Sequence, residues 1–148
     1  MSPTLVDDSV TDLEAADIKL TFDPTFLAFS GAEAGTLTGG FSVVAGAPMP
    51  VGLLMEVLVS MAAPISGITG GPGGVLVASF VITDTAPFGT TAVVFESLDA
   101  TLYDFPLTIA QIKVNNVPLG NAGGMLLCAL GALLGVRRRS ILPSLTVS

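Results

Sequence analysis

Short runs of alternating apolar and polar residues, separated by glycine and proline, constrain this chain more than any other feature. In residues 17–22 (DIKLTF), Ile18, Leu20 and Phe22 fall on one side of an extended chain and the polar residues on the other. This is the period-two pattern of a half-buried strand. Pro24 then ends the run, because proline cannot donate to a sheet. Turn signals recur at roughly 8–12 residues, which predicts an all-β antiparallel sandwich or barrel.

The remaining runs fit the same interpretation. Residues 53–63 could form a helix, since Leu, Met and Glu favour one, but the flanking Pro50 and Pro64 and the valine content favour a strand. Residues 75–83 are apolar on both faces, which predicts a central strand between two layers. Residues 67–74 (GITGGPGG) lack the Lys-Ser/Thr of a phosphate loop and are expected to form a connector. Strands are expected at 17–22, 26–30, 39–46, 53–63, 75–83, 91–104 and 107–115, with Phe22, Phe26, Phe29, Phe80 and Phe95 in the core.

Composition excludes several classes of function. The 148 residues suit one domain plus a tail, and we place boundaries at 1–116, 117–139 and 140–148, the last expected to be disordered. The chain has no histidine and one cysteine, Cys128, which removes Ser-His-Asp and Cys-His nucleophiles and His- or Cys-based zinc sites. Twelve acidic and two basic residues precede Val117, a net charge of −10, which argues against nucleic-acid binding.

Carboxylates are the side chains that remain as candidates for metal binding or acid/base catalysis. Asp7, Asp8, Asp12 and Glu14 could gather around calcium, but their spacing matches no EF-hand loop, and solvated acidic residues are the better interpretation. Asp99 and Asp104 could instead form an acid/base pair.

Nothing in the sequence marks a cleft between Asp99 and Asp104, which flank Tyr103. We therefore expect a domain that is not an enzyme and needs no cofactor or metal. The absence of tryptophan and the single tyrosine also leave few rings on which a sugar could stack.

Residues 10–43 (VTDLEAADIKLTFDPTFLAFSGAEAGTLTGGFSV) and 55–104, with their DP turn and APFGTT segment, resemble cohesin-type domains. The likeness extends over about residues 10–114. It implies a nine-stranded jelly-roll β-sandwich, akin to a superfamily of carbohydrate-binding modules, that docks dockerin modules through a flat sheet face. We expect a non-catalytic binding module for a dockerin-like protein, with polysaccharide second. Outward positions on 17–22 and 96–104 are the candidate surface.

The start of the chain departs from this family. Only nine residues (MSPTLVDDS) precede the matching segment, and Pro3 and the Asp7-Asp8 pair disfavour a strand. We therefore expect the first strand to be missing or stunted, which would expose a sheet edge. A structural matrix protein that self-associates through this edge is the alternative function. Residues 1–10 also lack the features of a secretory signal peptide, and a late-started reading frame would explain both observations.

The tail has a different composition. Residues 119–136 form an uncharged 18-residue stretch, which as a helix would span about 27 Å, close to the ~30 Å hydrocarbon core of a bilayer. Arg137, Arg138 and Arg139 follow it directly. This pattern favours a membrane helix over a buried core helix, with the arginines in the cytoplasm and the acidic body outside. Cys128 is interpreted as an ordinary apolar residue of this segment.

Residues 117–139 (VPLGNAGGMLLCALGALLGVRRR) also resemble C-terminal sorting signals of the PEP-CTERM and VPLPA type. Val117, Pro118 and Leu119 match the short motif, whereas Gly120 and Asn121 replace its last residues. The resemblance implies processing by an exosortase and delivery to the envelope or extracellular matrix of a Gram-negative bacterium. The nine residues after the arginines extend beyond the usual end of such signals.

Overall fold

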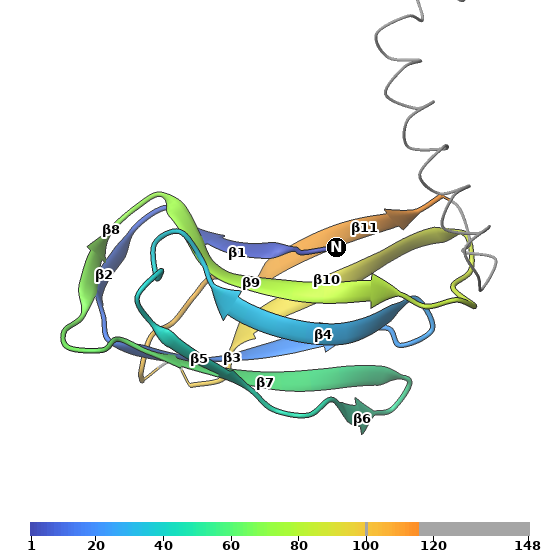
Figure 1. Cartoon of the computed structure of the whole chain (residues 1–148), viewed down its shortest axis with the longest axis horizontal. Coiled ribbons are helices and arrows are strands. Elements are labelled where there is room, and N and C mark those ends of the chain that lie inside the picture. Colours follow the sequence, from blue (N-terminus) through green and yellow to red (C-terminus); the bar gives the residue numbers. More distant parts are fainter. Residues whose placement is uncertain (100, 116–148) are drawn as a thin grey trace, which may run out of the picture.

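The computed structural model describes residues 1–99 and 101–115, and the elements within them are all β-strands in antiparallel pairings. Two sheets lie face to face as two layers, and a short two-stranded ribbon lies at one end (Figure 1). The strands are β1 (Thr4–Asp7), β2 (Val10–Leu13), β3 (Ala15–Phe22), β4 (Leu27–Ala34), β5 (Ser42–Ala45), β6 (Met49–Val51), β7 (Leu54–Ala62), β8 (Ile68–Gly70), β9 (Gly73–Ile82), β10 (Gly89–Ser97) and β11 (Thr108–Val114).

The large sheet has the order β11-β10-β3-β7-β5, and β6 also pairs with β7. Its central strand β3 confirms the alternation read from the sequence, because Ile18, Leu20 and Phe22 are buried and the residues between them are half-buried. In this register Lys19 lies between Leu58 of β7 and Glu96 of β10. The side chains that point away from the core therefore form a continuous outer face across five strands.

The small sheet has the order β1-β9-β4. Leu76, Ala78 and Phe80 of β9 point into the core and are at most 1% exposed, whereas Val81 on the opposite side is 59% exposed. The prediction that β9 is a central strand is therefore confirmed within its own sheet. The prediction that it lies between two layers is wrong, because its outer side is open at this end.

Aromatic side chains join the two layers. The ring of Phe80 in β9 meets that of Phe22 in β3 edge to face, with centroids 5.0 Å apart, and meets that of Phe29 at 5.6 Å. Such pairs add about 0.5–1.5 kcal/mol to the stabilisation from burial alone. Phe95 is also fully buried, and Phe26 and Phe29 are partly buried against the core, so the predicted phenylalanine core is confirmed.

Two turns follow the sequence prediction. The carboxylate of Asp23 accepts hydrogen bonds from the backbone N–H of Thr25 (2.8 Å) and from its hydroxyl (2.7 Å). Pro24 lies between them and fixes φ, as expected for a turn of this kind. Gly89 has a φ of +145°, a conformation open chiefly to glycine. These turns set the positions of β4 and β10.

The start of the chain corrects one prediction. The first strand is short, as one alternative allowed, but it is not missing: β1 pairs with β9 from Thr4↔Val77 to Asp7↔Gly73. The contact extends to Met1, whose backbone oxygen accepts a hydrogen bond from the N–H of Phe80 at 2.7 Å. Pro3 is tolerated because its carbonyl accepts from Ala78 while its missing N–H is not needed there.

Other strand limits also differ from the prediction. The strands β2, β6 and β8 were not predicted; β8 lies within the Gly-rich connector at 67–74 and pairs with β2. The described residues thus hold eleven strands where the resemblance implied nine. Conversely, β10 ends at Ser97. Residues 98–99 and 101–104 are not in a strand, and the N–H of Thr101 donates to Asp99 in a turn there.

Candidate functional site

The centre of the large-sheet outer face holds one lysine and two glutamates. Lys19 Nζ lies 2.8 Å from Glu96 Oε2 and 4.0 Å from Glu56 Oε1. The hydrogen bond to Glu96 raises the pKa of Lys19, and the charges of Glu96 and Glu56 act in the same direction, against a smaller lowering by desolvation. The register places Glu96 directly opposite Lys19, and Glu56 diagonal to it as the partner of Thr21, so the cluster joins β7, β3 and β10.

A third carboxylate extends this cluster along β3. The hydroxyl of Ser60 in β7 donates to Asp17 Oδ1 at 2.5 Å, and the two residues are register partners. Asp17, Glu56 and Glu96 together with Lys19 give the centre of the face a net charge of −2. A partner with positive charge would therefore be favoured here.

Exposed apolar side chains gather on the same face beside this cluster, on β5 and on the hairpin of β6 and β7. Val51 faces Leu54 across the hairpin, and Met49 faces Glu56, so the apolar and charged groups adjoin. Contiguous exposed apolar surface marks interaction sites in soluble domains. We call this group the hairpin patch; its members are Val44 (68% exposed), Met49 (50%), Val51 (50%), Leu53 (91%), Leu54 (42%) and Leu58 (37%).

Sequence reasoning missed the hairpin patch. Residues 53–63 were predicted as a strand, but the turn that exposes Leu53 was not recognised. The available signal was Val51-Gly52-Leu53-Leu54, a Gly-X pair between apolar residues, which is typical of a two-residue hairpin loop. Gly52 has a φ of +63°, as the first position of such a loop requires.

An apolar hollow of about 250 Å³ opens on the other side of β7 from the hairpin patch. Met55, the neighbour of Leu54, lines it together with Pro48, and the other side is formed by β4 and the end of β3. Its lining residues are Phe22, Pro24, Leu27, Ala28, Phe29, Pro48, Met55 and Thr83.

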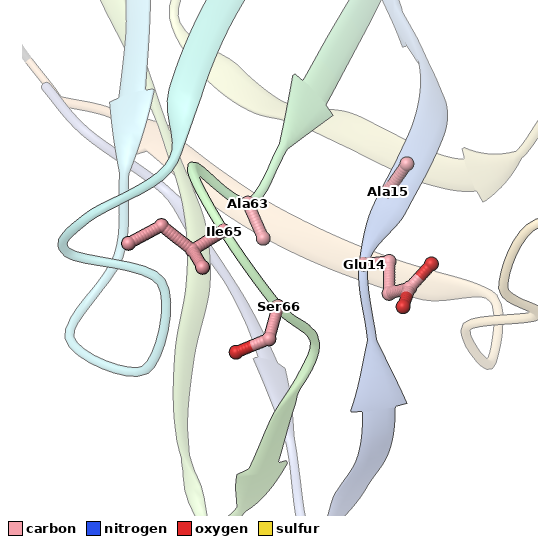
Figure 2. A pocket seen from close by; sticks show the side chains of 5 residues that line it. All are labelled: Glu14, Ala15, Ala63, Ile65 and Ser66. Atoms are coloured by element: carbon pink, nitrogen blue, oxygen red, sulfur yellow. The ribbon is translucent and has the colours of Figure 1, made fainter.

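Two other hollows carry less chemistry. One of about 270 Å³ lies between the start of β3 and the loop after β7, and Figure 2 shows Glu14 and Ala15 on one side of it and Ala63, Ile65 and Ser66 on the other. It contains one carboxylate, so it does not supply an acid/base pair. Another, of about 340 Å³, lies between residues 1–3 and residues 110–113 of β11.

Asp99 has a structural role in the turn after β10. Its carboxylate accepts hydrogen bonds from the hydroxyl (2.6 Å) and backbone N–H (2.9 Å) of Thr101. These two bonds lower the pKa of Asp99. The phenol oxygen of Tyr103 accepts instead from the N–H of Thr11 at 3.2 Å. Neither Asp99 nor Asp104 lines any of these three hollows.

The acidic residues near the start of the chain are separated by local structure. Asp7 accepts from the N–H of Ser9 at 3.1 Å, and the N–H of Asp12 donates to Thr69 Oγ1 at 3.0 Å. Within residues 1–99 and 101–115, the structure holds no group of three or more acidic or cysteine side chains placed to bind a metal ion.

The predicted sorting motif Val117–Leu119, the membrane segment and the basic stop Arg137–Arg139 lie outside the described residues. In the part of the chain that is described, no helix has the length and hydropathy needed to cross a bilayer.

Comparison with known proteins gives one structural likeness. A non-cellulosomal cohesin from the hyperthermophilic archaeon Archaeoglobus fulgidus aligns over 77% of this chain and 80% of its own, with a TM-score of 0.43 and 14% sequence identity. Neither a family model nor a curated protein matches the sequence. The class that the structure itself defines is an all-β domain of two packed antiparallel sheets.

Proposed function

We propose that this domain is a non-catalytic binding module of cohesin type, which docks a protein partner through the outer face of the large sheet. The observation that carries the proposal is that Lys19, in the candidate segment 17–22, is paired in one sheet with Glu96, the first residue of the candidate segment 96–104. On that face an ion cluster adjoins exposed apolar groups, the combination expected of a protein-docking surface. The jelly-roll connectivity and the dockerin-like nature of the partner are inferred from the sequence resemblance.

Binding is favoured over chemistry because the carboxylates near the centre of this face already have partners within the domain. Glu96 binds Lys19, and Asp17 binds Ser60. Groups held in this way contribute charge and shape to a surface.

The test uses the full chain and immobilised purified dockerin modules in surface plasmon resonance. Val94→Arg places a bulky charge at the half-buried outer position of β10 opposite Thr21. Val81→Arg is the matched control on the small sheet, where Val81 is 59% exposed. We expect at least about a tenfold loss of affinity for Val94→Arg, equivalent to about 1.4 kcal/mol, and no change for Val81→Arg. Loss only in Val81→Arg, or no dockerin binding at all, contradicts the proposal.

We also propose that residues 117–139 anchor or sort the domain, which would then face the outside of the cell envelope. The uncharged stretch 119–136 followed by Arg137, Arg138 and Arg139 supports this proposal. Membrane fractionation of cells that express the full chain provides the test. We expect the chain in the membrane or exported fraction, and release into the soluble fraction when Leu126, Leu127 and Leu133 are changed to Asp.

One structural observation favours self-association as a second candidate. Within the described residues, β1 and β11 each pair with a single strand and so lie at sheet edges, where another chain could add a strand. Sedimentation equilibrium separates the two candidates: edge pairing requires oligomers whose proportion rises with concentration, whereas heterotypic docking does not.

A further inference from the structure

We infer that the hairpin patch and the apolar hollow on the other side of β7 form the contact surface for a protein segment that presents aliphatic or aromatic side chains flanked by lysine and arginine. This inference rests on the proposed docking function and goes beyond it by assigning the β6–β7 hairpin, the hollow on the inner side of β7, and the chemistry of the partner.

The first step is the exposure of Leu53. It is 91% exposed at the tip of the hairpin, whereas its neighbours Val51 and Leu54 are 50% and 42% exposed. The two-residue turn, with Gly52 at a φ of +63°, fixes the orientation of the tip, and the pairings of β6 with β7 hold its base. A preorganised apolar group loses little conformational entropy when a partner covers it.

The second step is the hollow. Along β7, Leu54 points outward, and Met55, the next residue, points to the other side of the strand and lines the hollow. Its volume of about 250 Å³ suits a single large apolar side chain from a partner. Buried apolar anchors surrounded by weaker contacts carry most of the energy in protein interfaces. The patch supplies the surrounding contact, and the hollow supplies the anchor site.

The third step is charge, which selects the occupant. The cluster of Lys19 with three carboxylates beside the patch has a net charge of −2, and residues 1–116 carry −10. A second copy of the domain would bring the same negative charge against this surface, and an anionic lipid headgroup would be repelled likewise. A protein segment with basic and apolar side chains is attracted both by the negative charge of the cluster and by the apolar surface of the patch.

The test uses the full chain and two synthetic amphipathic helices of five turns, one built from leucine and lysine and its twin from leucine and glutamate. Binding is followed by fluorescence anisotropy at about 0.15 M salt, near physiological ionic strength. We expect the Leu/Lys peptide to bind and the Leu/Glu peptide not to bind. Leu53→Ser should weaken binding of the Leu/Lys peptide at least about tenfold.

Ile65→Ser is the matched control, because Ile65 is 95% exposed and lies in the loop at the other end of β7. Both changes are at exposed positions, where substitutions have little effect on stability. We expect Ile65→Ser to bind within about twofold of the parent chain.

Equal losses in Leu53→Ser and Ile65→Ser, or equal binding of the two peptides, would overturn the inference. Self-association that Leu53→Ser abolishes would overturn it in favour of a second copy as occupant. If Val94→Arg abolishes dockerin binding while Leu53→Ser leaves peptide binding unchanged, docking through the large-sheet face stands and the hairpin patch is excluded. If neither dockerin nor peptide binds, the proposed function fails as well.

Discussion

The outer faces of the two sheets differ although they cover the same core. The large-sheet face carries Lys19, three carboxylates and the hairpin patch. The small-sheet face carries mostly small uncharged side chains, such as Ala28 opposite Val81 and Ser79 within 3.2 Å of Ser2, with Glu33 as a charged residue opposite Val77. Both faces carry exposed apolar groups, Val6 and Val81 on the small sheet among them, but the large-sheet face gathers six of them beside an ion cluster.

This difference shows that the inward-facing and the outward-facing side chains of a strand are under different constraints. The inward residues of β3 and β9 are fixed by packing, because close-packed interiors accept few changes of volume. The outward residues are free of that packing constraint, so their chemistry can differ between the two faces without cost to the core. The following substitutions test whether the two faces are separable in this way.

The largest effect on the free energy of unfolding is expected in the core between the two sheets, because both outer faces depend on it. Phe80→Ala removes a ring that is 1% exposed and meets Phe22 and Phe29. We expect the free energy of unfolding to fall by about 3–5 kcal/mol, measured by urea denaturation. Phe88→Ala, at a residue 68% exposed, should change it by less than about 0.5 kcal/mol. A small effect of Phe80→Ala would mean that the layers do not share one core.

A smaller effect is expected beside the small sheet. The buried hydroxyl of Thr38 donates to the carbonyl of Val75 at 2.5 Å and accepts from the N–H of Gly35 at 3.0 Å. Thr38→Val keeps the shape but leaves these groups with fewer partners, so we expect a loss of about 1–3 kcal/mol. Thr38→Ser retains the hydroxyl and should lose less. Equal losses for both variants would show that the methyl group contributes as much as the hydroxyl and would contradict this expectation.

On the large-sheet face, Lys19→Met should cost about 0.2–1 kcal/mol, since exposed ion pairs contribute little. The pKa of Lys19 is raised by Glu96, so its contribution is complete below the ordinary lysine pKa of about 10.4 and is lost as pH rises through the folded value. The difference between parent and variant should therefore shrink in alkaline buffer and in about 1 M salt. A difference that is independent of both would contradict an electrostatic origin.

The smallest effect is expected at the turn after β10. Thr101 lowers the pKa of Asp99, so this contact stabilises the fold above the ordinary aspartate pKa of about 3.9 and is lost as pH falls through the folded value. Thr101→Ala should raise the pKa of Asp99, as measured by NMR titration, with an effect on unfolding below that of Lys19→Met. An unchanged pKa would exclude the hydroxyl as its cause.

The sequence predicted inward-facing positions better than outward-facing ones. The alternation of β3 and the Asp23-Pro24 turn were visible because local chemistry determines them. The short strand β6 was missed because Pro50 lies within it and it has only three residues, and β1 was doubted because of Pro3. Both pair at sheet edges, where a missing proline N–H is tolerated.

The hairpin patch could not be predicted because exposure depends on the neighbouring strands. Leu53 and Leu54 are apolar in sequence like the buried Val57 and Val59, and only the register of β6 with β7 separates them. The charged centre of the face was partly predictable, since Lys19 alternates with core residues, but its approach to Glu96 depends on the pairing of β3 with β10.

The pairing of Thr4 with Val77 also has a consequence for synthesis. As the chain leaves the ribosome, β1 has no partner until β9 has emerged, and contacts between such distant segments form late and slowly. During that interval the nascent apolar strands stay available to chaperones and to one another. Efficient production of this domain should therefore depend on slow elongation or chaperone supply more than that of a helical domain of equal length.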